Sequence, residues 1–223
     1  MKISAVQARR KPRQSRAKLT QEALQESFVR LLHERAAQEI TIREITDLAG
    51  VGLGTFYEYF SKKEDLIALT IHRQVKNNAE DLKTYAQSLI RLSTNLSLED
   101  YLEQIVHFQI QQIQAQQFLW AQTFLLERQV SSQDAYQKHY QLMTELWSDL
   151  LKPFIQQESP RLHSALNLHR TSYGFISQTL LVNCHFKDWD DLTQDILAAA
   201  QSFVGNLNPT VISPEMSKNQ RFE

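Results

Sequence analysis

The chain is poor in the residues that break helices or cross-link a fold. Its 223 residues include five glycines, five prolines and a single cysteine, Cys184. One cysteine excludes an internal disulfide and fits a reducing compartment. No segment approaches the roughly 20 apolar residues of a membrane span, and the charged N-terminus lacks the apolar stretch of a signal peptide. We therefore expect a cytoplasmic protein that does not enter a membrane.

The residues that are abundant favour helices. Leu, Ala, Glu and Gln are good helix formers, and Gln alone occurs 25 times. Three of the five glycines fall within residues 50–54, so the rest of the chain is almost free of breakers. No stretch alternates apolar and polar residues for long enough to indicate a sheet. The fold class that we predict is all-α.

The net charge of −1 hides an asymmetry along the chain. Residues 1–76 carry 14 Lys and Arg against 9 Asp and Glu, whereas residues 77–223 carry 10 against 16. The first 20 residues hold seven basic residues and no acidic one. A basic N-terminal part on an acidic body indicates a nucleic-acid-binding head. For the basic N-terminal arm taken alone, a solubilising tail is an equally good interpretation.

Residues 41–60, TIREITDLAGVGLGTFYEYF, carry the motif that points to a function. Thr41 and Glu44 have the spacing of a capping box that opens a short helix. Gly50 ends that helix, as a glycine just past a helix end does, and a second helix follows from Leu53 to Phe60. The apolar side chains that we expect inside are Ile45, Leu48, Val51, Phe56 and Phe60. A helix-turn-helix of this kind places its second helix in the DNA major groove; the alternative is an ordinary corner of two helices.

The second helix has an inner and an outer side. Phe56 and Phe60 point to the core on a helical wheel, whereas Gly54, Thr55 and Glu58 point away from it. Leu53 and Tyr57 flank the outer side near the helix N-terminus, where base edges are usually met. Because Gly54 has no side chain, the backbone there can approach DNA closely.

The segment 16–76 resembles the DNA-binding head of TetR-family transcriptional regulators. The residues that carry the resemblance are Thr41-Ile42-Arg43-Glu44-Ile45, Ala49-Gly50-Val51, Gly54-Thr55-Phe56-Tyr57, Tyr59-Phe60 and Lys63-Glu64-Asp65-Leu66. The resemblance implies a three-helix head, joined by a long helix to a C-terminal helical domain for ligand binding and dimerisation. The domains that we expect are a basic flexible arm (1–15), the head (16–76), the C-terminal domain (77–208) and a loose tail (209–223).

The resemblance also implies roles in binding DNA. Thr41 and Arg43 would face the DNA backbone or a groove edge, and Tyr57 and Lys63 would each contact a phosphate. The residues in or beside the major groove would be Leu53, Gly54, Thr55, Glu58 and Tyr59. Arg13 and Arg16 would reach the minor groove as an arm.

The sequence departs from the family pattern at two positions. Gly52 stands where the family usually has a serine that caps the recognition helix, at a cost of only a few tenths of a kcal/mol. Leu53 stands where the family often has lysine. Leucine cannot hydrogen-bond a guanine edge but can contact a thymine methyl group. We therefore expect an altered operator preference rather than a loss of DNA binding.

The resemblance further implies a homodimer, formed through the helices at 162–186 and 190–207. Gly174 on the first of these, and Ala198, Ala199 and Ala200 on the second, permit close packing. Two recognition helices that read half-sites about 34–36 Å apart require such two-fold symmetry. Packing within one chain is the alternative explanation for the small residues.

The middle helices are expected to hold a cavity for a small organic effector. Apolar walls with a few polar groups suit such a ligand, although any one of these side chains is more often plain core. The candidates are Phe108, Gln112, Trp120, Phe124, Tyr140, Met143 and Trp147, with Gln109 among them. Glu103, Glu127 and Glu145 are candidates to pair with a cationic ligand.

Two other classes of function stay open. The acidic cluster of Asp188, Asp190, Asp191 and Asp195 invites comparison with metal-dependent all-α enzymes, but the favourable placement of acids at a helix N-terminus explains it better. An architectural DNA-binding protein is the second alternative. The reading that we adopt is a ligand-responsive transcriptional regulator, most simply a repressor, that binds a palindromic operator as a dimer. We expect no catalytic residue, no metal site and no cofactor.

Overall fold

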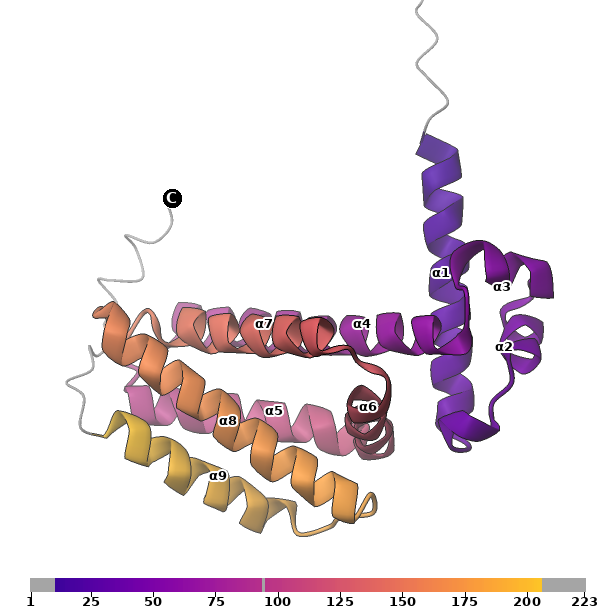
Figure 1. Cartoon of the computed structure of the whole chain (residues 1–223). Coiled ribbons are helices and arrows are strands. Elements are labelled where there is room, and N and C mark those ends of the chain that lie inside the picture. The colour runs from indigo at the N-terminus through magenta and orange to yellow at the C-terminus, as the bar shows by residue number, and fades with distance from the viewer. Residues whose placement is uncertain (1–10, 94, 206–223) are drawn as a thin grey trace, which may run out of the picture. The chain divides into compact units, whose positions relative to one another are not determined.

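A computed structural model describes the backbone of residues 11–93 and 95–205. Within this part the chain forms nine α-helices, one short 3₁₀ helix and no strand (Figure 1). The all-α prediction is confirmed. None of the helices in these ranges is long and apolar enough to span a membrane. The chain divides into two compact units at Thr70 and Ile71, the N-terminal unit and the C-terminal unit. The predicted tail, 209–223, lies outside the described residues.

The N-terminal unit is a small helical domain around one apolar centre. Its elements are α1 (Lys11–Leu32), η1 (Ala37–Glu39), α2 (Ile42–Ala49), α3 (Leu53–Tyr59) and the first turns of α4 (Lys63–Leu92). Helix α2 packs against both α1 and α3. The most deeply buried side chains come from every helix of the unit: Leu24, Phe28, Ile45, Phe56 and Leu66 are each at most 1% exposed. Burial of these side chains is what holds the short helices α2 and α3 in place.

Helix α1 is longer at its N-terminus than the sequence indicates. It begins at Lys11, so residues 11–15 of the predicted flexible arm belong to it; residues 1–10 lie outside the described part. Pro12 is tolerated in the first turn of a helix, where its missing N–H has no partner to lose. The helix ends at Leu32, and η1 takes up part of the segment before α2.

The predicted burial of Leu48 on α2 is wrong. Leu48 is 41% exposed, whereas Thr46 is 1% exposed. The buried stripe of α2 runs through Ile42, Ile45, Thr46 and Ala49, which is the i, i+3, i+4, i+7 spacing of one helical face. Leu48 lies off that stripe. Thr46 tolerates burial because its hydroxyl donates a hydrogen bond of 2.9 Å to the carbonyl oxygen of Arg43.

The C-terminal unit is a bundle in which α8 has a central place. It contains the rest of α4, α5 (Leu98–Ala115), α6 (Gln117–Val130), α7 (Gln133–Leu151), α8 (Glu158–Val182) and α9 (Trp189–Val204). Helix α8 packs against α6, α7 and α9, and α5 packs against α6 and α9 (Figure 1). Two apolar clusters fill the bundle; one includes Tyr101 and Trp147, the other Trp120 and Ile196.

Short polar and acidic side chains begin several of these helices. Ser97 accepts a hydrogen bond of 3.0 Å from the backbone N–H of Asp100, which confirms the predicted start of α5. At the start of α9, Asp190 and Asp191 lie in the first turn, where negative charge is favourable. Among the described residues, no three His, Cys, Asp or Glu side chains are grouped so that they could hold a metal ion.

Candidate nucleic-acid interface and effector cavity

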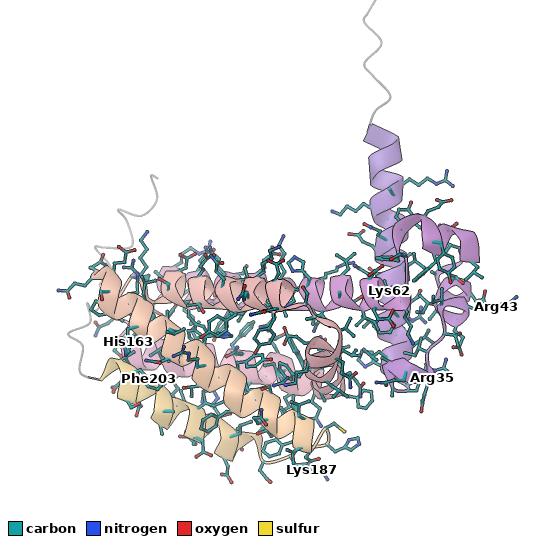
Figure 2. The ribbon with its side chains drawn as sticks, viewed as in Figure 1. Arg35, Arg43, Lys62, His163, Lys187 and Phe203 are labelled. Carbon is teal, nitrogen blue, oxygen red and sulfur yellow. The ribbon has the colours of Figure 1, made fainter. Side chains whose placement is uncertain are left out.

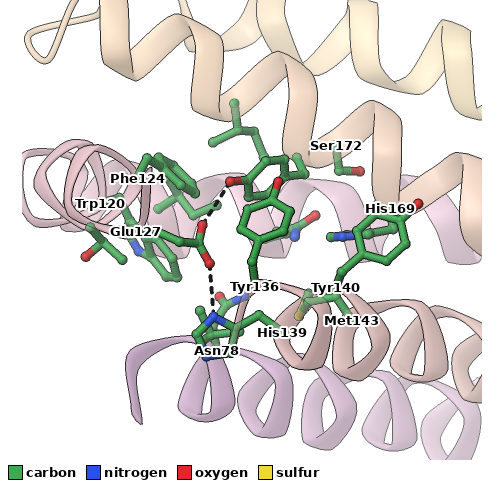
Figure 3. A pocket seen from close by; sticks show the side chains of 16 residues that line it. Asn78, Trp120, Phe124, Glu127, Tyr136, His139, Tyr140, Met143, His169 and Ser172 are labelled. Atoms are coloured by element: carbon green, nitrogen blue, oxygen red, sulfur yellow. Dashed lines mark hydrogen bonds and ion pairs between the residues drawn. The ribbon is translucent and has the colours of Figure 1, made fainter. Parts of the chain in front are cut away.

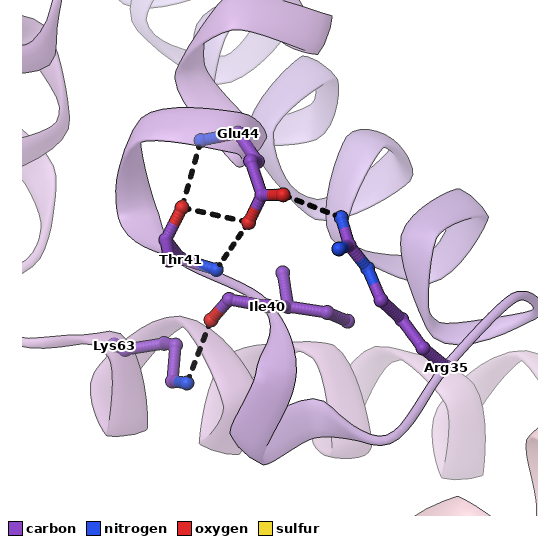
Figure 4. Close-up of polar contacts among 5 residues, drawn as sticks. All are labelled: Arg35, Ile40, Thr41, Glu44 and Lys63. Carbon is purple, nitrogen blue, oxygen red and sulfur yellow. Dashed lines mark hydrogen bonds and ion pairs between the residues drawn. The ribbon is translucent and has the colours of Figure 1, made fainter.

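Helix α2 begins with a complete capping box (Figure 4). The hydroxyl of Thr41 accepts from the backbone N–H of Glu44 at 3.2 Å, and the Glu44 carboxylate accepts from the backbone N–H of Thr41 at 2.8 Å. The guanidinium of Arg35 donates to the same carboxylate at 2.7 Å. The hydrogen bonds from Thr41, and then the contact with Arg35, lower the pKa of Glu44 to about 2. Thr41 and Glu44 are therefore engaged in fixing α2.

The turn between α2 and α3 contains two glycines, Gly50 and Gly52, with different conformations. Gly50 has φ +67° and ψ +30°, the left-handed conformation that ends α2. The next backbone N–H, of Val51, returns to the carbonyl oxygen of Thr46 at 3.0 Å. Gly52 has an extended conformation and is the N-cap of α3, with no side chain to cap the helix. The direction of α3 thus depends on Gly50 and on the burial of Phe56.

The outer side of α3 carries apolar, hydroxyl and acidic groups. Leu53 is 47% exposed and Tyr57 is 55% exposed. Gly54 and Glu58 are also exposed, while Thr55 and Tyr59 are half-buried. The helix itself contains no lysine or arginine. Any charge that neutralises phosphate must therefore come from other parts of the unit.

Several basic side chains of the N-terminal unit are exposed. Arg43 on α2 and Lys62 before α4 are exposed, and Arg43 extends outward from its helix (Figure 2). Arg16 on α1 is exposed as well. Arg13 lies in the first turns of α1, but its side chain is outside the described residues.

Lys63 makes contacts inside the unit that the sequence alone does not indicate. Its ammonium group donates to the carbonyl oxygen of Ile40 at 2.8 Å (Figure 4) and to that of Ala37, also at 2.8 Å. An ammonium has three N–H donors, and two are used inside the unit. Lys63 therefore ties the start of α4 to the segment before α2, and its phosphate contact stays a prediction. Lys62, one residue earlier, is exposed instead.

Residues 28–69 match the family model described as bacterial regulatory proteins, tetR family. The N-terminal unit thus carries the helix-turn-helix segment that the TetR family model describes. The matched residues span the capping box, the glycine turn and α3, so the family resemblance and the helix-turn-helix geometry rest on the same segment. No curated protein sequence matches the chain.

Solved structures extend the likeness to nearly the whole chain. A TetR transcriptional regulator from Rhodococcus sp. RHA1 is 17% identical, with a TM-score of 0.63 over 86% of this chain and 99% of that one. The fatty acid degradation regulator FadR from Bacillus halodurans is 21% identical, with a TM-score of 0.60 over 86% and 97%. FadR from Bacillus subtilis, solved in complex with stearoyl-CoA, is 19% identical, with a TM-score of 0.60 over 82% and 98%. At these identities the likeness establishes the fold, which is the TetR-family fold in both units.

A cavity of about 60 Å³ lies among the helices of the C-terminal unit (Figure 3). Three helices each line it with four residues at the i, i+3, i+4, i+7 spacing of one helical face. These are Trp120, Thr123, Phe124 and Glu127 on α6; Tyr136, His139, Tyr140 and Met143 on α7; and His169, Ser172, Tyr173 and Ile176 on α8. Val75 and Asn78 of α4 and Gln109 and Ile113 of α5 complete the wall.

Four of the predicted effector-site residues line this cavity and three do not. Trp120, Phe124, Tyr140 and Met143 are in its wall. Phe108 instead stacks on Tyr85, with ring centroids 4.1 Å apart and planes 7° from parallel. The other two also lie elsewhere: Trp147 is fully buried in an apolar cluster, and Gln112 is exposed beside a separate polar groove. The large side chains of Phe108 and Trp147 thus serve the packing of one apolar cluster and not the cavity wall.

The polar centre of the cavity is the carboxylate of Glu127, which is 4% exposed. It accepts from Nδ1 of His139 at 3.0 Å and from the hydroxyl of Tyr173 at 2.9 Å (Figure 3). Nε2 of His139 in turn lies 3.2 Å from Nδ1 of His72 on α4, and the two rings stack. The network thus runs from α8 through α6 and α7 to α4. Most glutamates on helices are exposed to solvent. Glu103 and Glu145, the other candidates from the sequence, are both exposed, unlike Glu127.

Burial sets the protonation of the cavity wall. It lowers the pKa of His169 to about 4, with the charge of Glu127 opposing the shift. The same burial, reinforced by Glu127, raises the pKa of Tyr173. Burial and the neighbouring His139 lower the pKa of His72. Near neutral pH His169 is therefore neutral and Tyr173 keeps its proton.

The wall residues His139, His169 and Tyr173 are absent from the sequence-based site. Their signal is nevertheless present, because the polar and aromatic residues 136, 139, 140 and 143 and then 169, 172, 173 and 176 repeat at the spacing of one helical face. What the sequence does not reveal is that α8 presents this face to α6 and α7.

The side of α8 that faces away from the cavity is partly apolar and exposed. Phe175 is 39% and Val182 86% exposed there. Leu162, which is 45% exposed, lies seven residues before His169 and so belongs to the other side of the helix. Gly174 and Phe175 line an open groove together with Phe203 of α9. Ala200, one of the small residues predicted to pack against a second chain, is 1% exposed and packs inside the unit instead; Ala198 is exposed and Ala199 half-buried.

Proposed function

We propose that the chain is a DNA-binding transcriptional regulator that recognises a palindromic operator as a homodimer and is released from it by a small organic effector. The observation that carries this proposal is the TetR-family helix-turn-helix, with α3 held by Gly50 and Phe56 and its outer side exposed. Such a helix reads base edges in the major groove.

The contacts to DNA divide into two kinds. Leu53, Thr55 and Glu58 would meet base edges, with Leu53 suited to a thymine methyl group and Glu58 to the amino group of cytosine. Tyr57, Arg43 and Lys62 would meet phosphates, which fix the position of the protein without reading sequence. Gly54 and Tyr59 complete the surface, and Arg16 on α1 is the candidate for the minor groove.

Dimerisation is supported by the exposed apolar side of α8. Phe175 and Val182 lie on a side of α8 that is exposed in the single chain, and the groove beside Gly174 gives room for close approach. Interfaces between identical subunits bury such apolar surface across a two-fold axis. A two-fold dimer would present two α3 helices to the two halves of a palindrome.

Release by an effector is supported by the cavity and by helix α4. FadR from Bacillus subtilis, with the same fold, has been solved in complex with stearoyl-CoA. In the present chain Val75, Asn78 and His72 of α4 contact or line the cavity region, and the same helix begins at Lys63 in the N-terminal unit. An effector that binds better to a non-binding arrangement of the heads would shift the population away from DNA.

The proposal is tested by selecting genomic fragments with the purified full chain at one fixed, near-physiological salt concentration. The expected result is a shared inverted repeat with half-sites about one helical turn apart. Retained fragments with no common sequence would favour an architectural protein. Retention of no DNA by the unliganded chain would contradict the proposal.

A further inference from the structure

The Glu127 carboxylate has unused acceptor capacity that faces the cavity. An ionised carboxylate has about four acceptor sites, and the protein fills two of them, from His139 and Tyr173. The Tyr173 hydroxyl is neutral, and His139 forms an ion pair with Glu127 only when its imidazole is protonated. A carboxylate that is 4% exposed is costly to keep without a compensating positive charge. The site is therefore built to accept a hydrogen bond from a positively charged donor.

Aromatic rings surround this carboxylate. Trp120, Phe124 and Tyr173 form a connected set, with ring centroids 5.5 Å apart for the first pair and 5.6 Å for the second. Tyr136 and Tyr140 of α7 line the cavity as well (Figure 3). The faces of such rings attract cations, and most strongly where water is excluded. Arg128 already lies over the Tyr173 ring, 5.8 Å from its centroid.

One of the two imidazoles in the cavity wall, that of His169, adds no competing positive charge near neutral pH. His169 is 5% exposed, and burial lowers its pKa to about 4. It packs edge-on against Tyr140, with ring centroids 5.0 Å apart. Because His169 is neutral, it does not oppose the binding of a cation beside Glu127.

We infer that the cavity binds a small organic cation, with a protonated amine hydrogen-bonded to Glu127 and the apolar part of the ligand against Trp120 and Phe124. This inference rests on the proposed function, since it names the chemical class of the effector. It separates this chain from a regulator whose effector is an acyl thioester, because a buried acceptor is the wrong partner for an anionic or purely acceptor headgroup.

The present cavity volume limits what enters without a change of shape. About 60 Å³ is the space of roughly two water molecules, whereas ligand pockets typically measure roughly 300–1,000 Å³. Tyr136 is 39% exposed and is the wall residue least fixed by burial. An ammonium group fits beside Glu127 as the cavity stands, and the hydrocarbon part requires Tyr136 to move outward.

The network gives the bound cation a route to α4. An ionised carboxylate only accepts, so His139 donates to Glu127 through Nδ1, and its Nε2 faces Nδ1 of His72. An ammonium bound to the free acceptor sites of Glu127 shares the negative charge of the carboxylate and weakens the bond to His139. The stacked His139 and His72 rings then lose the partner that fixes them, which alters the packing of α4 in the C-terminal unit.

The test compares three ligands of nearly equal size that differ in charge: 2-phenylethylamine, 2-phenylethanol and phenylacetate. Their affinities for the purified full chain are measured by calorimetry and by intrinsic tryptophan fluorescence. Trp120, which lines the cavity, contributes to that fluorescence. We expect the amine to bind about tenfold or more tightly than the alcohol, and the carboxylate to bind least, because charge-assisted hydrogen bonds are the stronger ones. Stearoyl-CoA serves as the fourth probe.

Two variants locate the binding group. Glu127→Gln keeps the shape of the side chain and removes its charge, so the amine should lose its advantage over the alcohol. Glu145→Gln removes an exposed carboxylate on α7 and should leave the affinities unchanged. Since the three-ligand comparison on the unmodified chain needs no variant, the inference stays testable if Glu127→Gln fails to fold.

Three results would overturn the inference: no binding of the amine at millimolar concentration, tighter binding of phenylacetate or stearoyl-CoA than of the amine, or equal amine affinity in Glu127→Gln. None of them bears on the selection of DNA by the unliganded chain. Failure of the cation site and failure of the proposed regulator function are thus separate outcomes.

Discussion

The Nζ atom of Lys63 lies 2.8 Å from the carbonyl oxygen of Ile40. This contact, together with the one to Ala37, joins the start of α4 to the segment that precedes the helix-turn-helix. It gives Lys63 a part in stabilising the head, beside the phosphate contact that the family resemblance implies for it. The neighbouring Lys62 keeps its charge on the surface.

The two lysines are therefore expected to respond oppositely to substitution. Lys63→Met removes two hydrogen bonds from a charged donor and should destabilise the N-terminal unit by about 2 kcal/mol. Lys62→Met should leave stability unchanged and weaken binding to all DNA sequences alike, with a smaller salt dependence. Urea denaturation and DNA titrations at two salt concentrations check this. Equal stability of the two variants would remove the structural role of Lys63.

The glycine turn offers a second matched pair. Gly50→Ala forces a side chain into a left-handed backbone and should cost about 1–2 kcal/mol, although a Cβ there would meet no atom within 4 Å. Gly52→Ser should instead stabilise the unit by a few tenths of a kcal/mol, because serine supplies the missing cap of α3. Denaturant midpoints of both variants measure the difference. A Gly50→Ala variant as stable as the unmodified chain would contradict the assigned conformation.

Substitutions on α3 should separate affinity from specificity. Tyr57→Phe removes a hydroxyl proposed to contact phosphate, so it should weaken binding to every DNA sequence by a similar factor. Leu53→Ala removes a group proposed to read a thymine methyl and should relax the preference at one position of each half-site. Repeating the fragment selection with each variant distinguishes the two. An unchanged motif and affinity in both would place α3 away from DNA.

His169 predicts a specific dependence of stability on pH. Its pKa is about 4 in the folded chain against the ordinary 6.5. Between these values the unfolded chain binds a proton that the folded chain does not, so stability falls as the pH is lowered from 6.5 to 4. The full effect is roughly 3 kcal/mol. His169→Gln should flatten this part of the curve, whereas His163→Gln, at an exposed position of the same helix, should not. The same slope in all three proteins would contradict the burial of a neutral His169.

The exposed side of α8 predicts the oligomeric state. Phe175→Glu places a charge in the middle of the proposed interface and should convert the dimer to a monomer in sedimentation equilibrium. Leu125→Glu alters a similarly exposed residue of α6, 37% against 39% exposed, and should leave the dimer intact. A chain that is already monomeric without substitution, or a dimer that survives Phe175→Glu, would show that this side of α8 is not the interface.

The helices and the DNA-binding head follow from sequence because their signals are local. The capping box of Thr41 and Glu44 and the stop at Gly50 each involve residues a few positions apart, and the structure has both. The contacts of Lys63 could not be predicted in this way, because its partners, Ala37 and Ile40, lie on another segment of the unit. The start of α1 differs from the prediction because a basic composition indicates an arm and does not forbid a helix.

Only some of the residues that line the cavity could be predicted from the sequence, for a physical reason. A large apolar residue looks the same in the sequence whether it lines a cavity, as Trp120 does, or fills the core, as Trp147 does. Glu127 and His139 acquire their meaning only when α6 and α7 bring them to 3.0 Å. Pairing of this kind depends on how the helical faces are turned toward one another, and periodicity within one helix does not contain that information.

The central claim is that the chain recognises a particular DNA sequence. The most direct test is the ratio of its affinities for the selected duplex and for a scrambled duplex of the same composition, measured at one near-physiological salt concentration. We expect the affinity for the selected duplex to exceed that for the scrambled duplex by about 10³ or more, with two chains bound to each selected duplex. Equal affinity for the two duplexes would contradict it and would leave only sequence-independent binding through phosphates.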